Sequence, residues 1–224
     1  MKPTKHRYSI LQQICKLIPR NLVSKLANKH GINKQSRKFT PWSHIVTLMY
    51  SQLAHSLSLN DVADTLRNHA GALHTIRGAT PPSRNGLSHA NKIRNADMAE
   101  ELFWNVLSHI KSIHPQFGFN SKYRALPRRF KRAIYAVDST TIQLVANCVS
   151  WAKHRRRKAA AKCHMQLNLQ TFLPQFAIVK AANTHDSTAA QELCANLKDG
   201  EIALFDKAYI DFKHLAHLNN RGVF

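Results

Sequence analysis

Apolar residues recur at helical spacing through the first half of the chain. The pattern begins with Ile10, Leu11, Ile14, Leu17 and Ile18, and it resumes at Leu22, Val23, Leu26 and Ala27. Pro19 separates the two runs and is expected to interrupt the helix, because proline lacks a backbone N–H group. Positions three and four apart share one face of a helix, so the pattern predicts two short amphipathic helices.

Polar residues mark where further helices begin. Thr40 precedes Pro41, the order typical of an N-cap followed by proline at the first helical position, and this predicts a helix to about His55. Ser58, with Asp61 three residues later, resembles a capping box and predicts a helix to about His69. After a turn-rich stretch at 71–86, helices are expected at 87–94 and from Asp97, as its cap, to about Ile110.

The pattern changes in the second half of the chain. Short apolar runs with strand character occur at 133–137, 142–145, 163–170, 176–181 and 202–205. Helices are expected at 186–197 and 211–220, and Gly222–Phe224 resembles the start of another strand. The predicted fold class is therefore α+β: an all-helical domain at 1–115, a basic linker at 116–132, and an incomplete α/β domain with a mixed sheet at 133–224.

The charge of the chain indicates a polyanionic partner. Thirty-three Lys and Arg stand against 12 Asp and Glu, which gives a formal net charge of +21, and the first acidic residue is Asp61. This excess favours nucleic-acid binding over a surface charged for solubility alone. Helix-turn-helix DNA binding and a plain bundle with a cationic face both fit the helical region.

Two other features bound the class of protein. The four cysteines include no Cys-x-x-Cys pair, which argues against a zinc site and a disulfide framework. No apolar run reaches the roughly 18 residues of a membrane span. A cytoplasmic protein without a membrane partner is expected.

Asp138 and Asp206 each follow an apolar run that is predicted to be a strand. Two carboxylates at neighbouring strand ends can bind a divalent metal beside a nucleic-acid phosphate. Alternatively, Asp138 forms a turn before Ser-Thr-Thr and Asp206 caps a helix that begins near Asp211. No Glu occurs after Glu201 and the sequence ends at Phe224, so the site is expected to lack a third carboxylate.

A basic segment lies between the two aspartates. The candidate DNA-binding residues are Lys153, Arg155, Arg156, Arg157, Lys158, Lys162 and His164, together with Arg128 and Arg129 of the linker. Their like charges predict an exposed loop that orders on phosphate. A solvated charged hairpin is the alternative, and for His164 a buried structural role is equally open.

Four motifs in fixed order carry a family resemblance. They are Tyr135–Ile142, Lys162–His164, Thr184–Ser187 and Leu204–Asp211. Together the motifs resemble those of bacterial insertion-sequence DDE transposases, of the insertion-sequence-four family. The helical region, with Phe39–Trp42 and Ser88–Asn91, resembles the domain that precedes the catalytic domain in many members. The resemblance implies a ribonuclease H-like fold, in which an antiparallel three-strand meander is followed by a helix that crosses to a fourth strand beside the first.

The same resemblance implies the chemistry. Asp138 matches the first catalytic aspartate and Asp206 the second, each a ligand of Mg²⁺ or Mn²⁺. Tyr209 falls in the Asp-x-Gly-Tyr segment of the family, although Ala208 occupies the glycine position. The third carboxylate of the family lies in a later Tyr-Arg-Glu-Lys signature. DNA at transposon ends and targets, a homo-oligomer in the active full-length form, and association with the nucleoid are also implied.

The expected function is metal-dependent DNA strand cleavage and strand transfer in transposition, by a chain cut short before its catalytic Glu. The alternative is a non-enzymatic DNA-binding protein, or an inhibitor of the full-length transposase. A general nucleic-acid binder explains the charge but not the paired aspartates.

Overall fold

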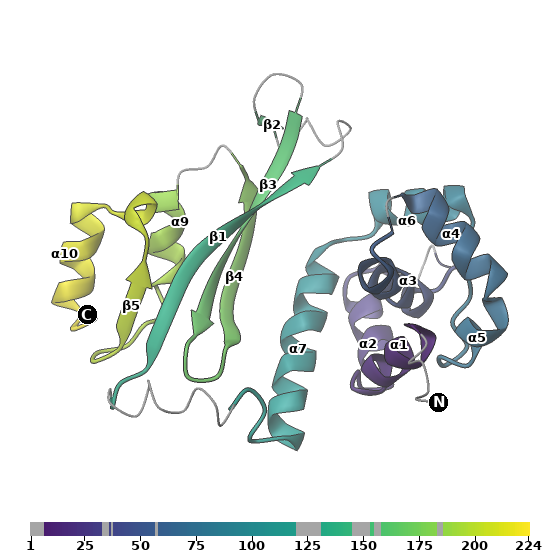
Figure 1. The fold of residues 1–224 in the computed structure, drawn as a ribbon, viewed down its shortest axis with the longest axis horizontal. Coiled ribbons are helices and arrows are strands. Elements are labelled where there is room, and N and C mark those ends of the chain that lie inside the picture. Colours follow the sequence, from purple (N-terminus) through teal and green to yellow (C-terminus); the bar gives the residue numbers. More distant parts are fainter. Residues whose placement is uncertain are drawn as a thin grey trace, which may run out of the picture. The chain divides into compact units, whose positions relative to one another are not determined.

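The computed structural model describes residues 7–32, 36, 38–56, 58–119, 131–144, 153–154, 158–182 and 186–224. These residues belong to two compact units, Met1–Pro115 (unit 1) and Gln116–Phe224 (unit 2). Unit 1 is helical and unit 2 contains the sheet (Figure 1). The predicted α+β class is confirmed.

Unit 1 begins with α1 (Arg7–Lys16), α2 (Leu22–Lys29), α3 (Pro41–Ala54) and α4 (Leu59–Asn68), followed by α5 (Ala70–His74), α6 (Arg84–Ile93) and α7 (Asp97–Ile113). Two of the predicted caps are confirmed. The Thr40 hydroxyl accepts from the Ser43 N–H at 3.0 Å, and the Ser58 hydroxyl accepts from the Asp61 N–H at 3.1 Å. Each satisfies a backbone donor that a helix start leaves unpaired.

Two expectations for unit 1 were wrong. The turn-rich stretch contains α5, and α6 begins at Arg84 because the Ser83 hydroxyl accepts from the Gly86 N–H. Asp97 is the first residue of α7 and not its cap, since its own N–H donates to Asn95 Oδ1 at 2.9 Å. Local side-chain hydrogen bonds thus shifted the helix starts by a few residues.

The core of unit 1 consists of two apolar clusters that share partly buried residues. Leu11, Val46, Leu66 and Leu73 belong to one cluster, and Val23, Leu26, Met98 and Leu102 to the other. Trp42 packs against both clusters and donates its indole N–H to Ile76 O at 2.9 Å. The Arg77 guanidinium lies 4.9 Å from the centre of the Trp42 ring and donates to Cys15 O and Ile18 O, at the end of α1. Trp42 and Arg77 therefore connect the two clusters.

Unit 2 contains β1 (Ile134–Leu144), β2 (Lys153–His154), β3 (Lys158–Asn168), β4 (Leu173–Ala181), α9 (Asp186–Leu193), β5 (Ile202–Phe205), the 3₁₀ turn η4 (Lys207–Tyr209) and α10 (Phe212–Asn220). β3 pairs antiparallel with both β1 and β4, and β5 lies parallel to β1 on the other side. α9 separates β4 from β5 in the chain, so it is the predicted crossover helix. The predicted meander and fourth strand are confirmed (Figure 1).

The runs at 133–137 and 142–145, predicted as two strands, contribute to one continuous strand, β1. β1 pairs with β3 without interruption from Tyr135↔Asn168 to Leu144↔Ala159. The Ser-Thr-Thr sequence after Asp138 therefore does not turn, and its two β-branched threonines suit an extended strand. Part of the basic segment is also strand, because Lys153 and His154 of β2 pair with Ala159 and Lys158 of β3.

The chain after α10 pairs with the open edge of β5. The Phe224 N–H donates to Glu201 O at 2.9 Å, and the Ala203 N–H donates to Phe224 O at 2.7 Å. These two bonds have the pattern of a parallel pair of strands. They agree with the prediction that Gly222–Phe224 begins strand-like pairing.

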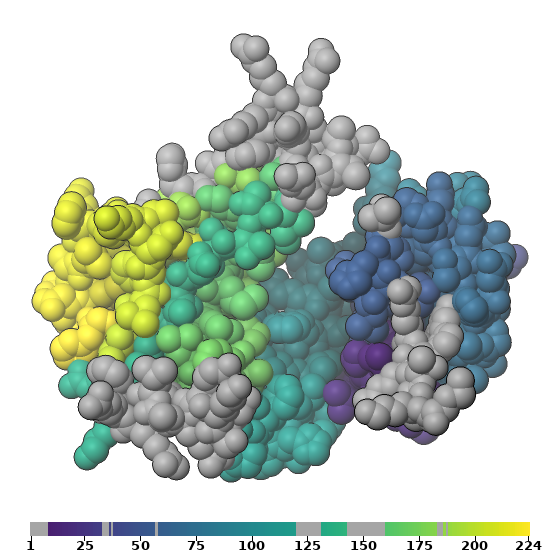
Figure 2. Space-filling model, viewed as in Figure 1, coloured from purple at the N-terminus to yellow at the C-terminus, as the bar shows by residue number. Residues whose placement is uncertain are grey.

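One face of the sheet is covered and the other is open. Tyr135 and Val137 of β1 pack with Ala189, Ala190 and Leu193 of α9 and with Leu218 of α10. Since side chains alternate along a strand, Ile142, Val179 and Leu204 lie on the opposite face, where they are 46, 61 and 49% exposed. Atoms of β1, β3 and β4 form part of the surface in Figure 2.

No helix within the described ranges combines the length and the apolar character needed to cross a membrane.

Candidate metal centre

Asp138 and Asp206 occupy corresponding positions where the parallel pairing of β1 with β5 ends. The β1–β5 pairing runs from Ile134↔Ile202 to Val137↔Phe205, and the next residue is an aspartate in both segments: Asp138 within β1 and Asp206 directly after β5. Adjacent strands lie about 4.8 Å apart. Val137 and Phe205 pack on the face of the sheet that α9 covers. Because successive side chains point to opposite faces, the aspartate after each of them lies on the open face. Both residues are exposed.

The local backbone explains the position of each carboxylate. Asp138 lies within β1 and not at its end, but it is where parallel pairing with β5 stops; its Oδ1 accepts from the Ser139 N–H at 2.7 Å. Asp206 is extended, with φ −79° and ψ 177°, and its Oδ1 accepts from the Ala208 N–H as the cap of η4. α10 is capped by Asp211 instead. Asp206 thus caps the short turn that follows β5.

The two carboxylates fit a hard divalent cation. Magnesium and manganese ions prefer oxygen ligands, and Mg²⁺ commonly binds through one or two carboxylates with water and substrate phosphate completing its shell. In each aspartate Oδ1 receives a backbone N–H, and the described residues place no hydrogen bond on Oδ2. The described part of the chain contains no group of three or more His, Cys, Asp or Glu side chains arranged to hold a metal.

A buried polar network lies on the covered side of the sheet, next to the two aspartates. Tyr209 is 1% exposed and its hydroxyl lies 3.0 Å from Nδ1 of His164, which is fully buried. The Ser139 side chain also hydrogen-bonds to Tyr209. His164 Nδ1 lies 3.7 Å from Asp186 Oδ1, and the Lys162 ammonium donates to both Asp186 oxygens at 2.8 and 2.9 Å. The network links β1, β3, α9 and η4.

The pKa values show how this network is charged. Burial raises the pKa of Tyr209, the hydrogen bond from Ser139 opposes that rise, and the charges of Asp186, Asp138 and Asp206 add to it. Burial lowers the pKa of His164, with Asp186 opposing and Lys162 and Lys180 reinforcing that effect. Near neutral pH the network contains a neutral phenol and a neutral imidazole.

The structure corrects the prediction that His164 contacts DNA. His164 pairs with Ser139, whereas Asp138 pairs with Met165, so alternation directs His164 away from the aspartate face. Its side chain is fully buried beneath α9 and contacts Tyr209, which leaves no surface for a phosphate. The buried structural alternative is correct for this residue.

The described residues include only some of the other predicted DNA contacts. Lys162 is ion-paired with Asp186, and its side chain is 20% exposed. Lys153 and Lys158 belong to β2 and β3, but their side chains are outside the described set. Arg128, Arg129, Arg155, Arg156 and Arg157 lie outside the described residues. For all of these except His164, DNA contact stays a prediction.

Ser139 and Asp186 belong to the buried polar network but were not among the residues predicted for the site. Asp186 was predicted only as the start of a helix at 186–197, and it is the first residue of α9. The signal that could have found it is the alternation of Lys162 and His164 on β3, because two basic side chains buried on one face need an acidic partner.

Comparison with known families identifies unit 2. Residues 129–224, which include Asp138 and Asp206, match the family of transposase DDE domains. The chain carries a transposase DDE domain. In front of this DDE domain, residues 6–76 match a domain of unknown function (DUF4372). No curated protein and no solved structure matches the chain. The predicted resemblance to insertion-sequence DDE transposases is confirmed, and the match supports a transposase. Members of this family generally use divalent metal ions.

Proposed function

We propose that Asp138 and Asp206 are the first two carboxylates of the DDE site and together bind Mg²⁺ or Mn²⁺. The observation that carries the proposal is the β1–β5 register, which brings the two aspartates opposite each other on one exposed face. When bound, such an ion stabilises charge on the scissile phosphate and activates the attacking water or hydroxyl. The proposed reaction is strand cleavage at insertion-sequence ends, followed by strand transfer to target DNA.

The buried network has a positioning role in this proposal. Tyr209 follows Asp206 by three residues, and its hydroxyl is fixed by His164 of β3 and Ser139 of β1. These bonds tie the turn after β5 to the two strands beside it. They limit how far Asp206 can move from Asp138, which matters because metal affinity depends on ligand spacing.

The metal site is tested by Mn²⁺ titration of residues 1–224, followed by electron paramagnetic resonance. Asp138→Asn and Asp206→Asn keep the side-chain shape but remove a charged ligand, so each is expected to weaken Mn²⁺ binding at least tenfold, about 1.4 kcal/mol. Asp97→Asn removes an exposed aspartate from unit 1 and is the matched control. Equal affinity in all four proteins would show that the aspartate pair is not the metal site.

A second proposal concerns residues 1–224 on their own: they bind DNA without cutting it, as a DNA-binding protein or an inhibitor of a complete transposase. The supporting observation is the formal net charge of +21, which favours a polyanionic partner. In a cleavage assay on duplex DNA with Mg²⁺, no cut product is expected, whereas binding should weaken steeply with salt. Cutting that Asp138→Asn abolishes would contradict this second proposal. Oligomer formation in an active form stays a prediction.

A further inference from the structure

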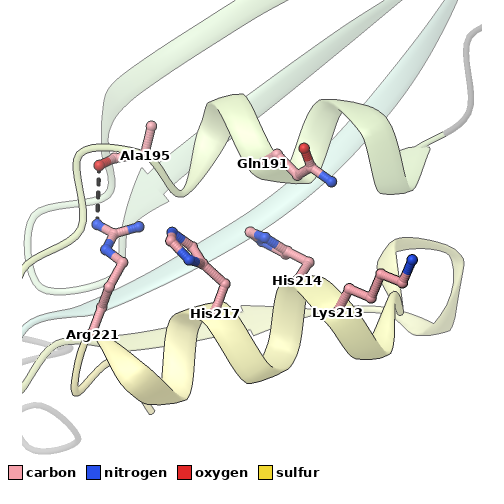
Figure 3. A pocket seen from close by; sticks show the side chains of 6 residues that line it. All are labelled: Gln191, Ala195, Lys213, His214, His217 and Arg221. Carbon is pink, nitrogen blue, oxygen red and sulfur yellow. Dashed lines mark hydrogen bonds between the residues drawn. The ribbon is translucent and has the colours of Figure 1, made fainter.

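A groove lies between α9 and α10, on the helix side of unit 2 and away from the aspartate face. Its volume is about 580 Å³, and it is lined by Gln191, Ala195, Lys213, His214, His217 and Arg221. In Figure 3 the side chains of α10 project toward α9, and Gln191 projects back toward α10. The groove is large enough for a phosphate group with part of the sugar attached to it.

The charge of the groove is of one sign. Lys213, His217 and Arg221 are spaced four residues apart, so they form a row along one side of α10. The described residues that line the groove include no carboxylate. Arg221 donates to Cys194 O at 3.2 Å and to Ala195 O at 3.0 Å, and it also donates to Leu197 O. Its charge is thereby fixed at one end of the groove.

His214 is a buried polar residue whose hydrogen bonding is incomplete. It is 5% exposed, and the described residues provide no partner for its Nε2 atom. Leaving a buried polar atom unpaired costs about 1–3 kcal/mol. Burial lowers the pKa of His214; the charge of Asp211 opposes this effect, and His217 and Arg221 reinforce it. A neutral imidazole directed into a cationic groove can donate to or accept from a ligand.

We propose that the α9–α10 groove is a phosphate-binding site. The Lys213 ammonium supplies a point charge, and the imidazoles of His214 and His217 and the amide of Gln191 supply hydrogen bonds. The ligand is a phosphate group, carried either by a nucleic-acid strand or by a small phosphorylated molecule. Because the groove is on the opposite side of the sheet from Asp138 and Asp206, phosphate binding there does not involve the proposed metal site.

The test follows the histidine side-chain resonances by NMR during titration with inorganic phosphate, in EDTA and at constant ionic strength. Failure of the metal site leaves this experiment unaffected, because no metal is present. Saturable shifts of the His214 and His217 signals are expected, and Lys213→Gln should weaken binding about fivefold, as expected for loss of one partly exposed charge contact. Lys111→Gln removes an exposed lysine from α7 and should leave the affinity unchanged.

A single-stranded oligonucleotide in the same titration identifies the source of the phosphate. Shifts of the same two signals with the oligonucleotide assign the groove to nucleic acid, and shifts with inorganic phosphate alone assign it to a small molecule. The proposal fails if neither probe produces saturable shifts, or if Lys111→Gln weakens binding as much as Lys213→Gln. His214→Phe removes Nε2 and should also lose affinity; Lys213 is exposed, so its variant retains the fold and decides the outcome.

Discussion

The two units bury polar side chains in opposite ways. Among the described residues of unit 1, each buried polar side chain has a partner: Ser43 with Thr40 and Thr80, His44 with Asn91 at 2.7 Å, and Thr47 with Ser43 O at 2.7 Å. In unit 2, His164 Nε2, both polar atoms of Gln166 and His214 Nε2 have none among the described residues. All three of these residues lie between the sheet and α9 or between α9 and α10.

The difference indicates where unpaired buried polar groups lower the folding stability of the protein. Buried polar groups in folded proteins are nearly always hydrogen-bonded, and exceptions concentrate at functional sites. Unit 1 follows the rule, so its polar core serves to hold the helices together. In unit 2 the unpaired buried polar groups lie close to the aspartates and to the α9–α10 groove. The metal site and the phosphate site are therefore proposed at these two positions.

The largest expected effect is in the partnered core of unit 1. Trp42→Ala removes an indole that packs on both clusters, donates to Ile76 O and stacks with Arg77. We expect a loss of about 3–5 kcal/mol in the free energy of unfolding, measured by urea denaturation with circular dichroism. The control is Phe103→Ala, whose side chain is 48% exposed and which should cost far less. Equal losses would show that Trp42 does not connect the clusters.

The next prediction contrasts one partnered and one unpartnered polar residue. Gln166→Met keeps the length of the side chain and removes an amide without partners, so the free energy of unfolding should rise by about 1–3 kcal/mol. Thr47→Val keeps its shape but loses the bond to Ser43 O, and should lower the free energy of unfolding by about 1 kcal/mol. Urea denaturation measures both. If both variants are destabilised, Gln166 has a partner in solution and the contrast between the units is weaker.

Acid should affect unit 2 more than unit 1. Burial lowers the pKa of His44 in unit 1, and of His164 and His214 in unit 2, from the ordinary value of 6.5. The unfolded chain binds more protons below that value, so the stability is complete above about pH 6.5 and falls as pH decreases, by at most about 1.4 kcal/mol per pH unit for each histidine. Hydrogen exchange of sheet and helix amides at pH 7.5 and 5.5 reports each unit separately. Greater loss of protection in unit 1 would contradict the comparison.

The smallest expected effect concerns the network beside the aspartates. Tyr209→Phe keeps the ring and removes the bonds to His164 and Ser139, at a cost of about 1 kcal/mol in stability. Because Asp206 is then less firmly held, Mn²⁺ affinity should fall about threefold, which is under 1 kcal/mol. Tyr135→Phe is the matched control, since its hydroxyl donates to Glu201 at the other end of β5. If both variants bind Mn²⁺ equally, Tyr209 has no positioning role.

The sequence predicted the positions of the helices and strands better than it predicted which helix packs on which face of the sheet. The caps at Thr40 and Ser58 depend on residues three positions away, so local pattern was sufficient. The continuity of β1 through Ser139 was missed because those residues also suit a turn, and only pairing with β3 keeps them extended. The pairing of β1 with β3 belongs to the tertiary structure, so the local sequence could not reveal it.

The same limit applies to the site. Neighbouring strands for Asp138 and Asp206 were expected from the order of elements, and the register agrees. Alternation along a strand places Lys162 and His164 on one face of β3. It could not show that α9 covers that face, and coverage by α9 decides that His164 is buried instead of facing DNA.

Cys163 is a natural site for chemical labelling on the open face of the sheet. It pairs with Thr140, two residues after Asp138, and alternation places both on the aspartate face. Burial raises the pKa of Cys15 and Cys194 to about 11, which makes these thiols slow to alkylate, whereas Cys163 is only half-buried. With Cys148 replaced by serine, a maleimide dye would attach beside the aspartate pair, and its fluorescence would report the arrival of metal or DNA without any engineered cysteine.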